Sequence, residues 1–143
     1  MINRLNVASI YVLDKEEALD FYVNKLGLEV GNDVRQGDYR WLTVRVPGNP
    51  ETEVSLEQPG PPLHDEATAA QLRELVTKGA LGGLVFITDD ARGLYETLKA
   101  RGVTDFTQEP TDHLYGTDMG IRDPFGNPIR ILQQEKVAEP VSA

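Results

Sequence analysis

Glu57 and His113 are the two side chains of this sequence best suited to moving a proton at a binding site. A carboxylate or an imidazole held at a cavity can accept a proton and return it during a reaction. Glu57 ends a segment of alternating apolar and polar residues, and His113 stands just before another such segment. Each also has a structural interpretation, because Glu57 fits a salt bridge with Arg45 or Arg130 and His113 fits an exposed loop histidine. The sequence leaves both interpretations open.

The segments around these residues place polar and aromatic side chains together on one face of a sheet. Side chains alternate between the two faces of a strand, so residues two apart share a face. Such a face offers an aromatic platform, hydroxyls and charges, which suits a small polar or aromatic ligand. The predicted ligand-binding set on this face is Ser9, Tyr11, Trp41, Thr43, Arg45, Ser55, Glu57 and Arg130. Trp41, the single tryptophan, also fits packing in a core or at a dimer interface.

Other residues extend this prediction toward the end of the chain. A partly buried guanidinium at Arg130 binds a carboxylate or phosphate through two hydrogen bonds, or it neutralises Glu57. Tyr115 and Met119 alternate on one predicted strand and are expected to line the same cleft, with the methionine as a pliable apolar wall. His64 lies in a proline-rich loop and is expected to be structural or exposed.

The first half of the chain is predicted to form one helix among four strands. Residues 5–13 alternate as a strand, and Asp14 can cap a helix of about three turns that ends before Gly27. Three short segments bounded by turn residues follow as strands, at residues 28–34, 39–46 and 52–57. The faces opposite the polar set carry apolar residues suited to packing under helices: Ala8, Ile10, Val12, Leu42, Val44, Val54, Leu56, Ile129 and Ile131.

The second half repeats this order after an insertion. The run Pro-Gly-Pro-Pro at residues 59–62 can neither join a sheet nor continue a helix, so it marks the boundary. A helix over residues 66–78 follows, capped by Asp65, and it either closes over the cleft as a lid or lies on the surface. The later elements are a helix at 91–101 and strands at 84–88, 104–108, 115–122 and 128–133. We therefore expect a single domain with a first unit at 4–58, an insertion at 59–80, a second unit at 81–134 and a frayed tail at 135–143.

The two halves match when the second is shifted by 75 positions. Val12 pairs with Ile87, Asp14 with Asp89, Leu19 with Leu94, Gly27 with Gly102 and Leu28 with Val103. Such an internal repeat predicts an α+β fold of two tandem βαβββ units, whose curved mixed sheets surround a shared cleft and pair within one chain or across a dimer.

Two motifs of the sequence resemble motifs of the vicinal oxygen chelate superfamily. One runs from Val12 and Asp14 through Phe21-Tyr22 to Leu26-Gly27-Leu28, and the other is the turn Asp123-Pro124-Phe125-Gly126-Asn127. The superfamily includes glyoxalase I, bleomycin and fosfomycin resistance proteins and extradiol dioxygenases, and the resemblance covers about residues 5–133. It implies the βαβββ repeat, but it does not choose among these activities.

The resemblance also identifies the positions at which enzymes of the superfamily hold a divalent metal. These positions fall on Val7, on Gly83, on Arg130 and on either Ser55 or Glu57. Valine and glycine offer no donor atom, and a guanidinium is always cationic. We therefore expect neither a metal nor a cofactor.

Composition excludes several classes of partner. The 143 residues are 40% hydrophobic and 26% charged, as in a soluble globular domain, and the formal net charge of −9 disfavours nucleic acid and anionic membranes. No apolar run is long enough for a membrane span, and the absence of cysteine suits a reducing cytoplasm.

The expected function is that of a glyoxalase/bleomycin-resistance-like protein that binds a small aromatic or cationic molecule without the family metal, as a cytoplasmic homodimer. The alternative is a lyase- or dioxygenase-like enzyme with a rebuilt or metal-free site, in which Glu57 or His113 transfers a proton on a carbonyl or vicinal-oxygen substrate.

Overall fold

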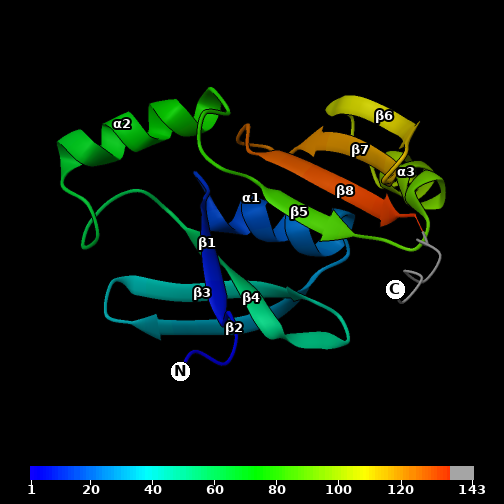
Figure 1. The fold of residues 1–143 in the computed structure, drawn as a ribbon. Coiled ribbons are helices and arrows are strands. Elements are labelled where there is room, and N and C mark those ends of the chain that lie inside the picture. Colours follow the sequence, from blue (N-terminus) through cyan, green and yellow to red (C-terminus); the bar gives the residue numbers. More distant parts are fainter. Residues whose placement is uncertain (136–143) are drawn as a thin grey trace. The chain divides into compact units, whose positions relative to one another are not determined.

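The computed structural model describes residues 1–135 and divides them into two compact units (Figure 1). The first unit comprises residues 1–82 and 123–127, and the second comprises residues 83–122 and, within the described part, residues 128–135. Each unit contains one mixed four-stranded sheet with accompanying helices, which confirms the predicted α+β class. Residues 136–143 of the predicted tail lie outside the described part.

The sheet of the first unit has the strand order β1-β4-β3-β2. Strand β1 runs parallel to β4, and the other neighbours are antiparallel. The strands are β1 (Val7–Tyr11), β2 (Glu29–Gln36), β3 (Tyr39–Val46) and β4 (Asn49–Glu57). The helices are α1 (Lys15–Leu19), the π-helix η1 (Asp20–Lys25) and α2 (Glu66–Thr77).

The second unit has the corresponding order β5-β8-β7-β6, with β5 parallel to β8. Its elements are β5 (Leu84–Ile87), α3 (Ala91–Ala100), β6 (Phe106–His113), β7 (Gly116–Arg122) and β8 (Pro128–Gln134). Gly27 and Gly102, matched by the sequence repeat, both follow the helix of their unit at φ 91°. The identical order of elements confirms the predicted duplication.

The first helix differs from the predicted regular helix. Asp14 caps it as expected, because its side chain accepts a hydrogen bond from the amide of Glu17 at 2.8 Å. After Leu19 the backbone hydrogen bonds join residues five positions apart, as in a π-helix. For example, the amide of Leu26 donates to the carbonyl of Phe21 at 2.8 Å. The wider turn places Phe21 and Tyr22 in the core, with their rings in edge-to-face contact.

The hydrophobic core contains most of the predicted apolar set. The buried members are Ile10, Val12, Leu42, Val44, Leu56, Ile129 and Ile131, whereas Ala8 and Val54 are partly exposed. Period-two alternation therefore assigned these buried residues to the core face of their strands correctly.

The turn at residues 123–127 belongs to the first unit. Asp123 is 3% exposed and accepts hydrogen bonds from three amides, those of Phe125, Gly126 and Asn127, at 2.9–3.0 Å. Its second oxygen accepts from the Tyr22 hydroxyl at 2.7 Å and from the Asn127 amide group at 2.8 Å. Asn127 also donates to the carbonyl of Tyr11 at 2.7 Å. A segment expected within the second unit thus completes the first.

Strand β6 extends further than predicted and reaches His113. Pro110 lies where the register with β7 shifts, so the missing N–H of the proline interrupts the ladder without ending the strand. Because β6 is an edge strand, the proline is tolerated there. His113 pairs with Gly116 at the end of the hairpin, so its side chain is held by a strand.

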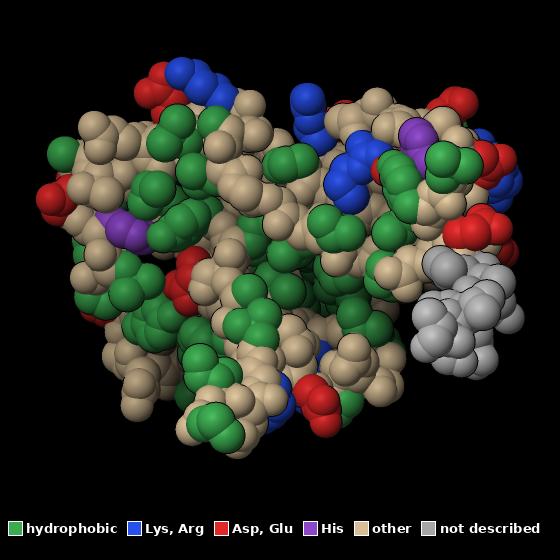
Figure 2. Space-filling model, viewed as in Figure 1, with side chains coloured by type: hydrophobic (Ala, Val, Ile, Leu, Met, Phe, Trp, Pro, Cys, Tyr) green, Lys and Arg blue, Asp and Glu red, His purple; other side chains and the backbone are tan. Residues whose placement is uncertain are grey.

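None of the helices in residues 1–135 is long and apolar enough to cross a membrane. Acidic and basic side chains are scattered in small groups among hydrophobic and neutral ones on the face shown in Figure 2.

Candidate functional site

The polar face of the first sheet brings together the predicted residues of the first unit. Its register sets Ser55 between Ser9 and Thr43, and it sets Glu57 beside Tyr11. Arg45 lies opposite Glu53 on the same face, and Trp41 precedes Thr43 by two residues along β3. The structure therefore gathers on this one face the residues Ser9, Tyr11, Trp41, Thr43, Arg45, Ser55 and Glu57.

Glu57 has an unusual position on this face, because one of its oxygens is buried and unpaired. The residue is 7% exposed, and Oε1 accepts hydrogen bonds from the Tyr39 hydroxyl at 2.8 Å and from Ser55 Oγ at 2.7 Å. Oε2 has no hydrogen-bond partner among residues 1–135. Buried polar atoms in proteins nearly always have a hydrogen-bond partner. An acceptor oxygen without a donor is therefore unusual at this position.

Tyr39 connects Glu57 to a lysine. Burial, followed by the hydrogen bond to Glu57, raises the pKa of Tyr39 to about 12, so its phenol stays protonated and donates. The Lys15 ammonium lies 5.2 Å from the centre of the Tyr39 ring, and burial lowers the pKa of Lys15 although the charge of Glu57 opposes this. Neither Lys15 nor Tyr39 was among the predicted site residues.

Tyr11 and His64 form an aromatic pair in the first unit. Their ring centroids are 5.6 Å apart in an edge-to-face arrangement, and the Tyr11 hydroxyl lies 3.4 Å from Nε2 of His64. The amide of Gly60 donates to Nδ1 of His64 at 3.3 Å, which leaves Nε2 as the protonated nitrogen that faces Tyr11. The predicted loop histidine thus links the proline-rich segment to the sheet.

Thr43 and Arg45 are occupied by other side chains of the face. Thr43 donates to Oε1 of Glu53 at 2.7 Å and accepts from the amide of Asn32 at 2.8 Å. Arg45 pairs with Glu29 at 2.7 Å and lies 3.7 Å from Oε2 of Glu53. Thr43 and Arg45 therefore bind other side chains of this face, whereas Glu57 has an acceptor oxygen without a hydrogen-bond partner.

In the second unit, the predicted residues gather around a carboxylate that the sequence analysis missed. Asp118 is 8% exposed and pairs with Arg130 through a short ion pair and with Nε2 of His113 at 3.0 Å. Although burial opposes it, the hydrogen bond and charge of Arg130 lower the pKa of Asp118 below its ordinary value. Tyr115 stacks on the His113 ring with centroids 4.8 Å apart and planes within 6°.

Met119 lies on the other side of this sheet. It pairs with Ile131 in the register and is fully buried, whereas Asp118 and Gly120 alternate with it. The prediction counted the alternation from Tyr115 and so assigned Met119 to the polar face. Strand β7 begins only at Gly116, so Tyr115 lies outside it and does not show which residues face the core. Counting from Ile121, a core residue, would have identified Asp118 instead.

Comparisons with known proteins agree with this architecture. The model of the glyoxalase/bleomycin resistance protein/dioxygenase superfamily matches residues 4–131. The chain belongs to this superfamily. It is 34% identical to the protein YurT of Bacillus subtilis (strain 168) over 132 residues, which cover 92% of this chain and 99% of YurT. Among solved structures it is similar to UcmS2, with a TM-score of 0.88 and 42% identity over 94% of this chain and 100% of that one.

A second solved relative in the superfamily is TnmS3, described as an antibiotic binding protein from Streptomyces sp. CB03234. It matches with a TM-score of 0.74 and 29% identity, covering 94% of this chain and 98% of TnmS3.

Three of the four positions that the resemblance assigns to the metal of superfamily enzymes carry no suitable ligand. Val7 has no donor atom, and a Cβ on Gly83 would come within 1.9 Å of the carbonyl oxygen of Pro128, so no side chain fits there. Arg130 is ion-paired with Asp118. Within residues 1–135, no group of three or more His, Asp or Glu side chains is placed to hold a metal ion.

Proposed function

We propose that this protein binds and sequesters a small aromatic compound that carries a cationic or hydrogen-bond-donating group, without a metal. The observation that supports this proposal is the buried, unpartnered Oε2 of Glu57. A cationic donor on a ligand would complete the hydrogen bonding of this carboxylate through a charge-assisted bond. The lack of cysteine suits a reducing cytoplasm as the place of action.

Energetics favour an occupant for this acceptor. A buried acceptor left without a donor costs about 1–3 kcal/mol, and more when it is charged. Both donors to Glu57 reach the same oxygen, Oε1, so no donor within residues 1–135 serves the second oxygen. The protein therefore gains stability when a ligand supplies that donor.

The aromatic side chains define the rest of the proposed ligand. Tyr11 lies beside Glu57 in the sheet register, Tyr39 donates to it, and Trp41 is only half-buried on the same sheet. Aromatic rings stack on planar ligands and attract cations through their faces. The description of TnmS3 as an antibiotic binding protein supports a binding role for a relative with the same fold.

The proposal is tested by titration with benzylamine and with its neutral counterpart benzyl alcohol. Because Trp41 is the single tryptophan, its fluorescence reports directly on this sheet face. The Glu57→Gln variant should weaken benzylamine binding by about tenfold or more, since one hydrogen bond to a charged group contributes about 1.5–3 kcal/mol. Binding of benzyl alcohol should change little, and the ligand should be recovered chemically unchanged.

The matched control is Glu53→Gln, because Glu53 lies on the same strand and is similarly buried but has partners for both oxygens. It should bind benzylamine as the natural protein does. Equal affinity of the natural protein and Glu57→Gln for benzylamine would contradict the proposal, as would equal weakening in both variants.

A second candidate function, proton transfer on a carbonyl substrate, is favoured by one observation in the second unit. Nε2 of His113 is engaged by the buried Asp118, which also holds Arg130, and this leaves Nδ1 of His113 to act as a base. Such a site would exchange the α-protons of hydroxyacetone for deuterium in heavy water, which proton NMR detects. Exchange that is lost in His113→Gln would establish this activity, and exchange no faster than in buffer would eliminate it.

A further inference from the structure

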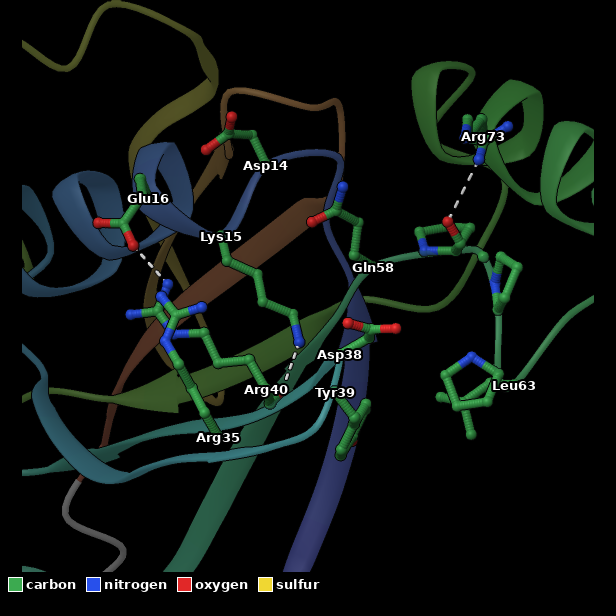
Figure 3. Close-up of a pocket in the computed structure, with 14 residues that line it drawn as sticks. Asp14, Lys15, Glu16, Arg35, Asp38, Tyr39, Arg40, Gln58, Leu63 and Arg73 are labelled. Carbon is green, nitrogen blue, oxygen red and sulfur yellow. Dashed lines mark hydrogen bonds and ion pairs between the residues drawn. The ribbon is translucent and has the colours of Figure 1, made fainter.

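A pocket of about 520 Å³ opens in the first unit, at the end of the sheet (Figure 3). It is bounded by the start of α1, the β2–β3 hairpin, the segment Gln58–Leu63 and α2. Tyr39 contributes to its wall and donates its hydroxyl to Glu57. Four cationic side chains line the pocket, Lys15, Arg35, Arg40 and Arg73.

Three carboxylates also line the pocket, but two of them are already engaged. Asp14 caps α1 through the amide of Glu17, and Glu16 pairs with Arg40. Asp38 is exposed in the hairpin turn. Arg40 is already paired with two carboxylates, because Asp33 also binds it through two hydrogen bonds of 2.9 Å.

The other three cations lack a carboxylate partner. Among residues 1–135 no Asp or Glu oxygen lies within ion-pair distance of Lys15, Arg35 or Arg73. Lys15 Nζ donates to the carbonyl of Arg40 at 2.6 Å, and Arg73 reaches the carbonyl of Pro59 only at 3.4 Å. Most of their N–H groups therefore remain available to a ligand.

The hairpin sets two of the cations directly against each other. Arg35 and Arg40 are opposite partners in the antiparallel register, so their side chains leave the same face of the hairpin. Like charges in that position repel each other. Asp33 and Glu16 form ion pairs with Arg40, whereas Arg35 has only a longer-range attraction to Asp33 and no ion pair within the described residues. In a protein with a net charge of −9, this group of cations without ion-pair partners forms a local site that attracts anions.

We propose that this pocket is a binding site for an oxyanion group, with a phosphate monoester preferred over a carboxylate, held by Lys15, Arg35 and Arg73. Phosphate presents more acceptor oxygens and more charge than a carboxylate, and three separate cations can surround it. The pocket volume exceeds that of a phosphate group alone, so the site also accommodates part of the molecule that carries it. This proposal is independent of the aromatic cation proposed at Glu57.

The experiment is a calorimetric titration with phenyl phosphate, benzoate and phenol. Phenyl phosphate should bind more tightly than benzoate, phenol should not bind, and rising salt should weaken phenyl phosphate binding. Arg35→Gln and Arg73→Gln should each weaken phenyl phosphate binding by about tenfold, since one close charge contributes at least that factor at a partly screened site. The control Lys78→Gln removes the same charge from an exposed lysine paired with Glu74 outside the pocket, and it should not change the affinity.

Several results would overturn the proposal. These are a lack of saturation by phenyl phosphate at millimolar concentration, equal affinity in a variant that combines Lys15→Gln with both arginine changes, and an equal loss in Lys78→Gln. Glu57→Gln should not weaken phenyl phosphate binding, because it removes a negative charge near Lys15. The two proposals therefore fail separately, one with phenyl phosphate and the other with benzylamine.

Discussion

The Tyr22→Phe variant tests whether the turn at residues 123–127 holds the first unit together. Tyr22 is fully buried and donates at 2.7 Å to a carboxylate oxygen of Asp123, which lies 101 positions later. The substitution removes one hydrogen bond to a charged acceptor, and Asp123 keeps its other donors. We therefore expect a loss of about 2 kcal/mol in the free energy of unfolding, within the range for such bonds. At this chain length the midpoint of thermal unfolding should fall by about 4–8 °C.

The assay is urea unfolding and thermal melting, with Tyr95→Phe as the matched control. Tyr95 lies on the helix of the second unit and donates to Glu109 at 3.2 Å on the surface, so its loss should leave the melting midpoint unchanged. A loss for Tyr22→Phe as small as that for Tyr95→Phe would refute the reasoning.

The same pair predicts a dependence on alkaline pH. Burial, and then the charge of Asp123 and the hydrogen bond to it, raise the pKa of Tyr22 well above its ordinary value of 10.0. The folded state therefore favours the neutral phenol, and its stabilising effect is complete below pH 10.0 and is lost as the pH rises toward the folded pKa. The stability difference between the natural protein and Tyr22→Phe should narrow above that pH, and a constant difference would contradict the assignment.

Three further predictions follow from the second unit. Although burial opposes it, the hydrogen bond and charge of Arg130 lower the pKa of Asp118, so the stabilising effect of this carboxylate is present above pH 3.8 and is lost as the pH falls through the folded pKa. Asp118→Asn should flatten the acid limb of a stability–pH curve, and an unchanged limb would contradict this. In Gly120→Ala the new Cβ would lie 2.3 Å from Thr107 Oγ1 and 2.7 Å from Arg130 Nη1, and urea unfolding should show a loss of about 1–3 kcal/mol, whereas no loss would show that both side chains move aside freely. Val85 and Ile87 are 68% and 58% exposed on the edge strand β5. If they form the expected homodimer interface, light scattering should find a dimer that the Val85→Lys variant converts to a monomer. A natural protein that is already monomeric would contradict the homodimer.

The sequence predicted the sheets well because their signals are local. Period-two alternation assigned Leu42 and Leu56 to the core and Ser55 and Glu57 to the other face, and the structure places them so. The repeat of turn residues such as Gly102 indicated the duplication for the same reason, since a positive φ after a helix is a local requirement.

The candidate site was harder to predict because its decisive features depend on distant partners. Nothing in the residues around Glu57 indicates that both of its donors reach the same oxygen. Asp118 was missed because its role comes from Arg130 on another strand, and the parity count started at Tyr115, outside the strand. The π-helical turn was also beyond a spacing argument, because a regular helix and a π-helix share the same apolar residues over six positions.

The turn at residues 123–127 has a consequence for how the chain is made. The ribosome releases the N-terminal end first, yet the carboxylate that receives the Tyr22 hydroxyl is synthesised near the end of the chain. A fragment that ends at residue 82 would hold a complete sheet but would leave a buried phenol without its acceptor. The first unit is thus completed by five residues that are encoded within the second half of the chain.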